Sequence, residues 1–219
     1  MALRRLAPVK PAMSIDNSMQ TRRSRFRFFL REAASIALLL FGLMMVRSTL
    51  ADHYHVPSGS MEPTLVPGDR VVVDKRNYGL RVPFTGIALT AGNPVQRGEV
   101  VIFDSPRDGT RLIKRIVAVG GDTVAIRNGR LSINGRVMAH AAQLDVEVFG
   151  DRLVALDLSD GGGPDFFGTV PEGKLLAVGD HRGNSLDGRV FGLIDAASVY
   201  GRAVAVYFRK GDGFIWLSL

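Results

Sequence analysis

The chain has 219 residues, of which 46% are hydrophobic and 22% are charged, so most of it is expected to fold into one or two small domains. It contains no cysteine, which excludes disulfide bonds, thiolate catalysis and cysteine-bound zinc or iron–sulfur centres. The net charge is +7, but residues 1–32 alone carry eight basic and two acidic side chains. The rest of the chain is therefore nearly neutral, which argues against a folded surface that binds nucleic acid.

A hydrophobic segment of 14 uncharged residues, 33–46, follows this basic arm. If Arg47 extends its guanidinium to the membrane surface, residues 33–51 are long enough for one transmembrane helix. Positive charge before the segment predicts a cytosolic N-terminus. A buried core helix would leave the basic arm unexplained, and a cleaved leader ending near Ala51 would have an unusually long arm. We predict a basic cytosolic arm (1–32), a transmembrane anchor (33–51) and one extracytoplasmic domain (52–219).

The rest of the chain has the patterns of an all-β domain. Two Asn-Gly hairpin turns flank a four-residue strand at 130–133. The glycine-rich segment 158–165 is expected to be a loop. Short runs of β-branched residues bounded by glycine, proline and aspartate predict further strands at 70–74, 100–103, 112–119 and 200–208. We expect an all-β domain with a small inserted β-lobe at about 121–172.

A rigid loop after the hydrophobic segment carries the first candidate for chemistry. Residues 57–64 contain two serines, a glycine and two prolines. Ser60 can act as a nucleophile only if a neighbouring base takes its proton. His53 and His55 could form a metal pair, but they have no clear third ligand. His181 follows Asp180, and neighbours on a strand point to opposite faces, so this pair is no evidence of a catalytic triad.

Lys114 is the more telling candidate base. The chain has only five lysines against 23 arginines, and Lys114 lies inside a hydrophobic run. In a strand it shares a face with Leu112 and Ile116, while Arg115 points to the other face. Burial disfavours the charged form of a lysine, so its pKa should fall, which suits a general base. The alternative is a half-exposed strand lysine whose stem covers the core.

A polar, glycine-rich segment at 179–189 completes the set of candidates. It contains Asp187 and Arg189, which can form an ion pair, and the hydroxyl of Ser185. By itself this is an ordinary loop. Next to a catalytic base, the same groups could hold the base in place.

Four segments, in this order, resemble the bacterial type I signal peptidases, which are membrane-anchored serine proteases that remove signal peptides from exported preproteins. They are Ser58–Thr64, Arg97–Phe103, Ile113–Asp122 and Gly179–Arg189. The resemblance spans most of the chain from the hydrophobic segment to about residue 202. It implies a signal-peptidase-like β fold, anchored in the inner membrane, with its partners being preprotein signal peptides and membrane lipid and no nucleic acid. It implies no cofactor and no metal.

The resemblance also implies a role for each site residue. Ser60 would be the nucleophile and neutral Lys114 its general base, working through an acyl-enzyme. The Ser60 backbone N–H and the Ser58 hydroxyl would stabilise the oxyanion. Ser185 would hold the lysine amine, and Asp187 and Arg189 would shape the loop beneath it. Val56 and Ile113 would line shallow pockets for small substrate residues, and the substrate would lie extended beside residues 52–56 and 111–114.

Three positions depart from the family pattern. His181 stands where asparagine is usual, Gly188 where serine is usual and Glu99 where aspartate is usual. None of them is a proposed catalytic residue. They leave two alternatives open: a related peptidase with one dedicated substrate, or a catalytically silent, anchored β-domain that binds exported chains. Hydrophobic residues at 82–84 and 87–89 could dip into the lipid surface or belong to an ordinary hairpin.

Overall fold

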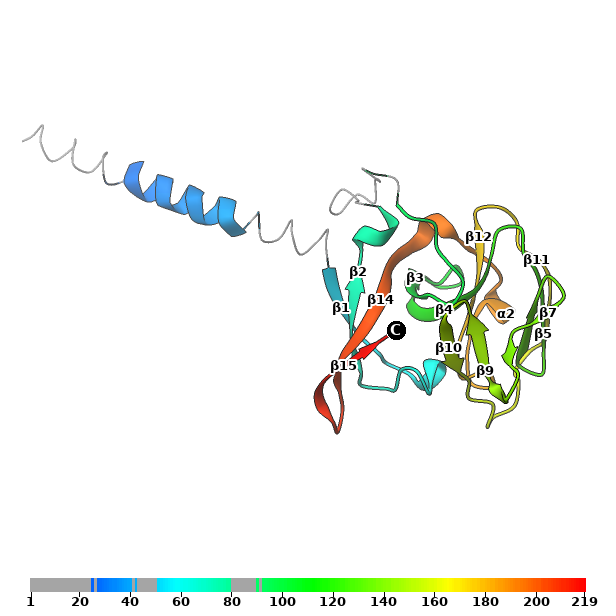
Figure 1. Cartoon of the computed structure of the whole chain (residues 1–219). Coiled ribbons are helices and arrows are strands. Elements are labelled where there is room, and N and C mark those ends of the chain that lie inside the picture. Colours follow the sequence, from blue (N-terminus) through cyan, green and yellow to red (C-terminus); the bar gives the residue numbers. More distant parts are fainter. Residues whose placement is uncertain (1–24, 26, 41, 43–50, 80–89, 91) are drawn as a thin grey trace, which may run out of the picture. The chain divides into compact units, whose positions relative to one another are not determined.

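The protein is described here by a computed structural model that covers residues 25, 27–40, 42, 51–79, 90 and 92–219 (Figure 1). The chain divides into two compact units, Met1–Met45 and Val46–Leu219. In the first unit, residues 27–40 form a helix. Among the described residues, no helix is both long and apolar enough to cross a membrane. Most of the second half of the predicted anchor lies outside the described residues, as do the hydrophobic residues at 82–84 and 87–89.

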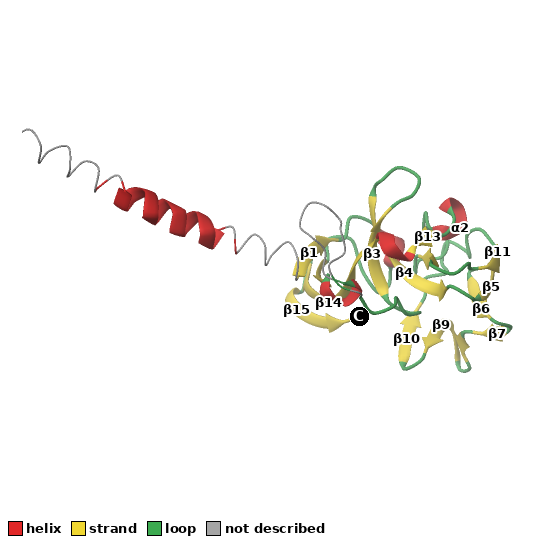
Figure 2. Ribbon diagram, turned by 90° about the horizontal axis from the view of Figure 1, so that it is seen from above, coloured by secondary structure: helices red, strands yellow, loops and turns green. Residues whose placement is uncertain are grey.

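The regular secondary structure of the second unit is almost entirely β-strand, which confirms the predicted all-β class (Figure 2). The strands are β1 (Ala51–His55), β2 (Arg70–Asp74), β3 (Val100–Asp104), β4 (Arg111–Val119), β5 (Thr123–Arg127), β6 (Arg130–Ile133), β7 (Arg136–Val137), β8 (Ala139–His140), β9 (Gln143–Phe149), β10 (Arg152–Ala155), β11 (Phe166–Thr169), β12 (Lys174–Val178), β13 (Ile194–Asp195), β14 (Val199–Arg209) and β15 (Gly213–Ser218). The helical segments are short: η1 (Gly59–Met61), η2 (Arg76–Tyr78), α2 (Gly188–Phe191) and η3 (Ala196–Ser198).

Eight of these strands form one antiparallel sheet in the order β1-β2-β14-β3-β4-β12-β13, with β15 also paired to β14. Two smaller sheets, β10-β9-β8 and β11-β5-β6-β7, come from the chain between β4 and β12. Both lie within the segment predicted to be an inserted lobe, whose boundaries stay a prediction. The site described below is built on the large sheet and on two loops between its strands, the loop from β1 to β2 and the loop from β12 to β13.

The strands expected from the sequence are confirmed to within one residue at their ends. Asn128 and Asn134 have φ angles of 47° and 52°, the left-handed conformation that the predicted Asn-Gly hairpin turns require. Ala51, the last residue of the predicted anchor, begins β1 and pairs with Asp74 of β2. The bounds of the anchor stay a prediction.

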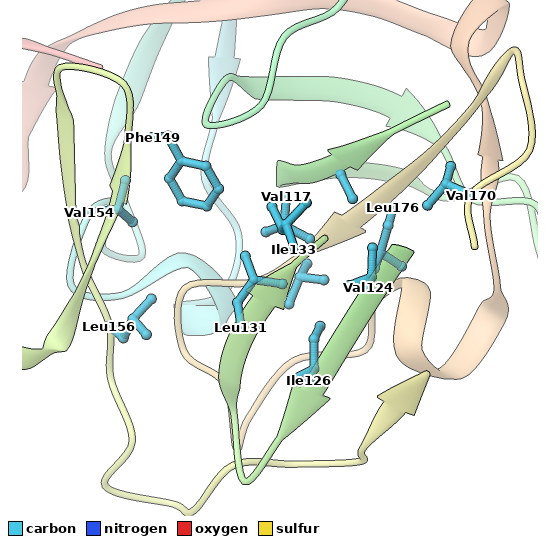
Figure 3. Packing of buried hydrophobic residues seen from close by; sticks show 12 residues of the cluster. Val117, Val124, Ile126, Leu131, Ile133, Phe149, Val154, Leu156, Val170 and Leu176 are labelled. Carbon is cyan, nitrogen blue, oxygen red and sulfur yellow. The ribbon is translucent and has the colours of Figure 1, made fainter. Parts of the chain in front are cut away.

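Alternating burial explains why the smaller sheets pack on the large one. In β5 and β6 every second residue is buried, so that Val124, Ile126, Leu131 and Ile133 face one side. They pack with Val117 of β4 and with other side chains of one hydrophobic cluster (Figure 3). A second cluster contains Val56, Met61, Leu65, Val71, Val73, Val100, Ile102, Ile113, Ala203 and Val206, and therefore lies under the loop that carries Ser60.

A buried ion pair joins the two smaller sheets to the loop after β12. Both Nη atoms of Arg182 donate to the carboxylate of Glu147 on β9, at 2.8 and 2.6 Å. Arg182 also donates to the carbonyl oxygens of Gly129, in the β5–β6 turn, and of Gly179. The two charged side chains are at most 1% exposed. Such a pair is costly to desolvate, and losing one partner leaves the other charge buried and uncompensated.

Replacement of Glu147 tests this interaction. We expect Glu147→Gln to lower the free energy of unfolding by about 3–5 kcal/mol, because Arg182 keeps a buried charge. The control is Asp104→Asn, which removes the partner of Arg111 in an exposed pair and should cost less than about 1 kcal/mol. Urea denaturation of the full chain in detergent, followed by circular dichroism, measures both. Equal losses in the two variants would contradict the assignment.

Candidate active site

Ser60 lies in η1, a single helical turn that backbone hydrogen bonds and buried side chains hold in place. The Glu62 N–H donates to the Gly59 carbonyl oxygen at 2.9 Å, and the Leu65 N–H donates to that of Met61 at 2.9 Å. Met61 and Leu65 are fully buried, which anchors the turn in the hydrophobic cluster beneath it. Ser60 itself stays partly exposed. Packing and backbone bonds therefore fix the serine without covering it.

The loop after β12 lies directly against the Ser60 backbone. A Cβ atom at Gly179 would be 2.4 Å from the Ser60 carbonyl oxygen and 2.2 Å from Ser185 Oγ, so only glycine fits there. Two residues on, the His181 N–H donates to the same carbonyl oxygen at 3.3 Å. The glycine-rich composition of this segment is thus a requirement of close backbone packing.

Lys114 reaches Ser60 from the middle of β4. Its side chain is only 3% exposed, and its Nζ donates a hydrogen bond to Ser60 Oγ. The alternative of a half-exposed strand lysine is therefore wrong. The Ser58 Oγ lies 3.3 Å from Ser60 Oγ. The structure thus brings together a serine hydroxyl, a buried amine and a second hydroxyl.

Burial lowers the pKa of the Lys114 ammonium to about 8. The carboxylates of Asp187 and Asp180 act in the opposite direction and raise it, while Arg189 lowers it further. Burial has the larger effect on this pKa, because the ammonium loses more solvation free energy than its attraction to the two carboxylates restores. A substantial fraction of Lys114 is therefore neutral in mildly basic solution, where most lysines remain protonated.

Arg115, next to Lys114 on β4, forms a buried network that the sequence reasoning missed. Its guanidinium donates to both oxygens of Asp180, at 2.9 and 2.7 Å, and to the Gly98 carbonyl oxygen at 2.7 Å. The Thr64 hydroxyl donates to Asp180 at 2.6 Å. One network therefore joins the serine loop, β4 and the loop after β12. The signal that could have revealed this network is the hydrophobic run on both sides of Arg115, because an arginine buried in such a strand needs a carboxylate partner.

Asp187 and Arg189 form the ion pair expected from the sequence, and both side chains are fully buried. Burial tends to raise the pKa of Asp187, but hydrogen bonds from Arg189 and the Gly179 N–H outweigh it, so this pKa lies below its usual value. The pair caps α2, since Asp187 also accepts from the Arg189 N–H. In contrast, Ser185 Oγ makes no hydrogen bond to the Lys114 amine, and the Ser185 side chain instead helps to lower the pKa of Asp187.

The remaining candidates are the two proposed pocket residues and two histidines. Val56 is 0% exposed and Ile113 is 4% exposed, both within the cluster under the serine loop. His53 and His55 are exposed, and within the described part of the chain neither belongs to a group of three possible metal ligands. A cavity of about 980 Å³, lined in part by Arg97, has neither Ser60 nor Lys114 in its walls.

The chain is similar in sequence to known proteins over most of its length. The family model described as "Signal peptidase, peptidase S26" matches residues 29–208. A signal peptidase I of Pseudomonas aeruginosa is 32% identical over 200 residues, which cover 80% of this chain and 70% of that protein. One from Bacillus licheniformis is 32% identical over 197 residues, covering 90% and 95%. A solved signal peptidase I structure from Enterococcus faecalis, 32% identical, covers 50% of this chain and 97% of that one, with a TM-score of 0.37.

These matches define the class of protein as a serine endopeptidase. More specifically, the chain belongs to the signal peptidase family, peptidase S26. The family membership rests on the sequence matches, which extend over most of the chain. It agrees with the resemblance inferred from the four ordered motifs.

Removal of the Thr64 hydroxyl tests whether the buried network supports the site. We expect Thr64→Val to lower the free energy of unfolding by about 1.5–3 kcal/mol, because the hydroxyl bonds to a charged group. Thr169→Val is the matched control, since Thr169 is exposed and its loss should change stability by less than about 0.5 kcal/mol. Urea denaturation measures both variants. A Thr64→Val variant as stable as the control would contradict the assigned role.

Proposed function

We propose that the protein removes N-terminal signal peptides from exported preproteins by cutting after small residues, with Ser60 as the nucleophile and Lys114 as its general base. The observation that carries this proposal is the hydrogen bond between Ser60 Oγ and the amine of a lysine that is 3% exposed. A buried lysine with a lowered pKa can accept a proton, which an ordinary surface lysine cannot do near neutral pH. Membership of the signal peptidase family supports the substrate class.

Acylation begins with attack of Ser60 Oγ on the carbonyl carbon of the scissile bond. The hydroxyl proton passes to neutral Lys114 Nζ, which becomes an ammonium group, and the carbonyl oxygen becomes an oxyanion. When the carbon–nitrogen bond breaks, the ammonium returns that proton to the departing amine of the mature protein. The signal peptide remains attached to Ser60 as an ester.

The oxyanion requires hydrogen-bond donors near Ser60. The proposed donors are the Ser60 backbone N–H and the Ser58 hydroxyl, whose Oγ lies 3.3 Å from Ser60 Oγ. Ser58 is exposed and its backbone is extended, so its hydroxyl is free to turn toward a bound substrate. One such donor contributes a factor of about 10²–10³ to the rate.

Hydrolysis of the ester reverses the proton path. Lys114, neutral again, takes a proton from water as the water oxygen attacks the acyl carbon. The ammonium then protonates Ser60 Oγ as the ester bond breaks, which releases the signal peptide with a free carboxylate and restores the enzyme. Neither half-reaction needs a redox partner.

Two strand edges that no described strand occupies support binding of an extended substrate. β12 pairs only with residues 115–119 of β4, so it does not cover the edge of that strand at 111–114. β1 is the terminal strand of the large sheet. Main-chain hydrogen bonds to such edges suit substrates that share little sequence. Val56 and Ile113 are the proposed pocket residues. Both are buried, so a substrate side chain contacts them only if the side chains that cover them move aside.

The proposed location is the inner membrane, with an N-terminal anchor and an extracytoplasmic catalytic domain. The basic arm, followed by 14 uncharged residues, supports this orientation. A membrane position would bring the enzyme to preproteins whose signal peptides are themselves inserted in lipid.

Replacing the two proposed catalytic residues tests the mechanism. We expect Ser60→Ala and Lys114→Met each to lower cleavage of a preprotein with an Ala-x-Ala site by at least about 10³-fold. Ser58→Ala should cost about 10²-fold through kcat, because one oxyanion donor is lost. Gel-based cleavage assays with the full chain in detergent measure these rates.

Lys174→Met serves as the lysine control, since the Lys174 side chain is 40% exposed and paired with Asp195, and it should cleave at the wild-type rate. Undiminished cleavage by Lys114→Met would refute the Ser–Lys mechanism. A wild-type protein inactive on several Ala-x-Ala substrates would favour one dedicated substrate or a silent binding domain.

The pH dependence of cleavage provides a separate test. Because Lys114 must be neutral to act as the base and its pKa is about 8, kcat/KM should rise with pH and level off above about 8. Below that value it should fall about tenfold per pH unit. Lys114→Arg should be inactive throughout, because guanidinium does not lose its proton. A fluorogenic peptide without ionisable groups near the cut measures the profile, and a flat profile from about pH 6 to 9 would contradict the assignment.

A further inference from the structure

A second cluster of ionisable side chains lies on the other side of the serine loop. His181, from the loop after β12, faces Glu62, which directly follows η1, and Asp157 and Asp160, from the loop after β10. The cluster therefore draws on three segments that are far apart in the sequence. None of its members takes part in the proposed peptidase chemistry.

His181 is the buried centre of the cluster. Its side chain is 7% exposed, and neither ring nitrogen has a hydrogen-bond partner among the described residues. Nε2 lies 3.0 Å from an oxygen of Asp160 and 3.8 Å from one of Asp157, and Nδ1 lies 3.9 Å from one of Glu62. Buried polar atoms are normally satisfied. An imidazole whose two ring nitrogens both face carboxylates can hold either a second proton or a metal ion at this place.

The spacing of these groups fits a single ion. One ligand atom each from Glu62, Asp157 and His181 can be chosen so that all three lie within 4.8 Å of one another. Atoms that bind one ion at about 2.0–2.2 Å can be no more than about 4.4 Å apart. Small side-chain movements would therefore complete the coordination.

Backbone bonds hold two of the ligands in place. Residues 157 and 181 form a parallel bridge, in which the Asp157 N–H donates to the Asp180 carbonyl oxygen at 3.0 Å and the Arg182 N–H donates to that of Asp157 at 2.9 Å. A Cβ atom at Gly183 would lie 2.3 Å from the Asp160 carbonyl oxygen, so the two loops are in direct contact. The positions of Asp157 and His181 therefore do not depend on an ion.

We propose that Glu62, Asp157 and His181 bind one divalent transition-metal ion, Zn²⁺ or Mn²⁺. An imidazole nitrogen combined with carboxylate oxygens suits these metals, whereas Mg²⁺ and Ca²⁺ prefer oxygen ligands alone. The three carboxylates are 28–59% exposed, which leaves a path for the ion to enter. The ion would join the serine loop to the loop after β10 and stabilise both.

Metal binding by the untagged full chain in detergent tests the proposal. After treatment with a chelator and dialysis against Zn²⁺ or Mn²⁺, mass spectrometry should find about one ion per chain. At a hundredfold excess over the dissociation constant, the melting temperature should rise by about 5–10 °C. Mg²⁺ and Ca²⁺ at the same concentration should give less than half of this shift.

Variants locate the ion. His181→Asn and Asp157→Asn should each weaken binding by at least about tenfold, while each variant keeps the circular dichroism spectrum of the wild type. His53→Asn, which changes an exposed histidine outside the cluster, should bind like the wild type.

Absence of a bound ion in the wild type would overturn the proposal and would identify the cluster as a histidinium balanced by carboxylates. Loss of binding in His53→Asn, with full binding in His181→Asn, would also overturn it. Both readouts are independent of cleavage, so they do not depend on whether the peptidase mechanism is correct.

Discussion

The ion pair between Arg115 and Asp180 is the interaction on which the rest of the site depends. It is almost completely buried, at 4% and 1% exposure, and it is bidentate. Through Thr64 it also holds the loop that carries Ser60. A guanidinium can satisfy several acceptors in one plane, which a lysine at the same position could not do. Three segments distant in sequence are thereby kept in one arrangement.

The same pair affects the neighbouring lysine. Residues 114 and 115 are adjacent on β4, so a strand that places Arg115 against Asp180 also determines where Lys114 can reach. Asp180 and Asp187 favour the charged form of Lys114, whereas burial and Arg189 disfavour it. Each carboxylate is itself paired with an arginine, so its effect on the lysine is limited. Burial can then bring the pKa of Lys114 to about 8.

Close backbone packing gives the site its rigidity. Gly179 lies against the Ser60 carbonyl oxygen, and Gly183 lies against that of Asp160. Arg182 lies between these glycines and is held by Glu147 from β9. The loop after β12 is therefore in contact with both the serine turn and the smaller sheets. A substitution in this loop, in the serine turn or in the smaller sheets is expected to shift atoms in the other two, because close-packed interiors transmit strain.

Local patterns in the sequence determined much of this protein. Runs of β-branched residues predicted β4 and β14, and the Asn-Gly turns predicted the β5–β6 hairpin, because these signals depend on residues close together in the chain. Ser60 and Lys114 were identifiable as a pair from ordered motifs. Only the tertiary structure decided that Arg115 pairs with Asp180, that Val56 is covered and that His181 lies among three carboxylates. These contacts join residues more than fifty positions apart or depend on the packing of whole loops, so no local pattern encodes them.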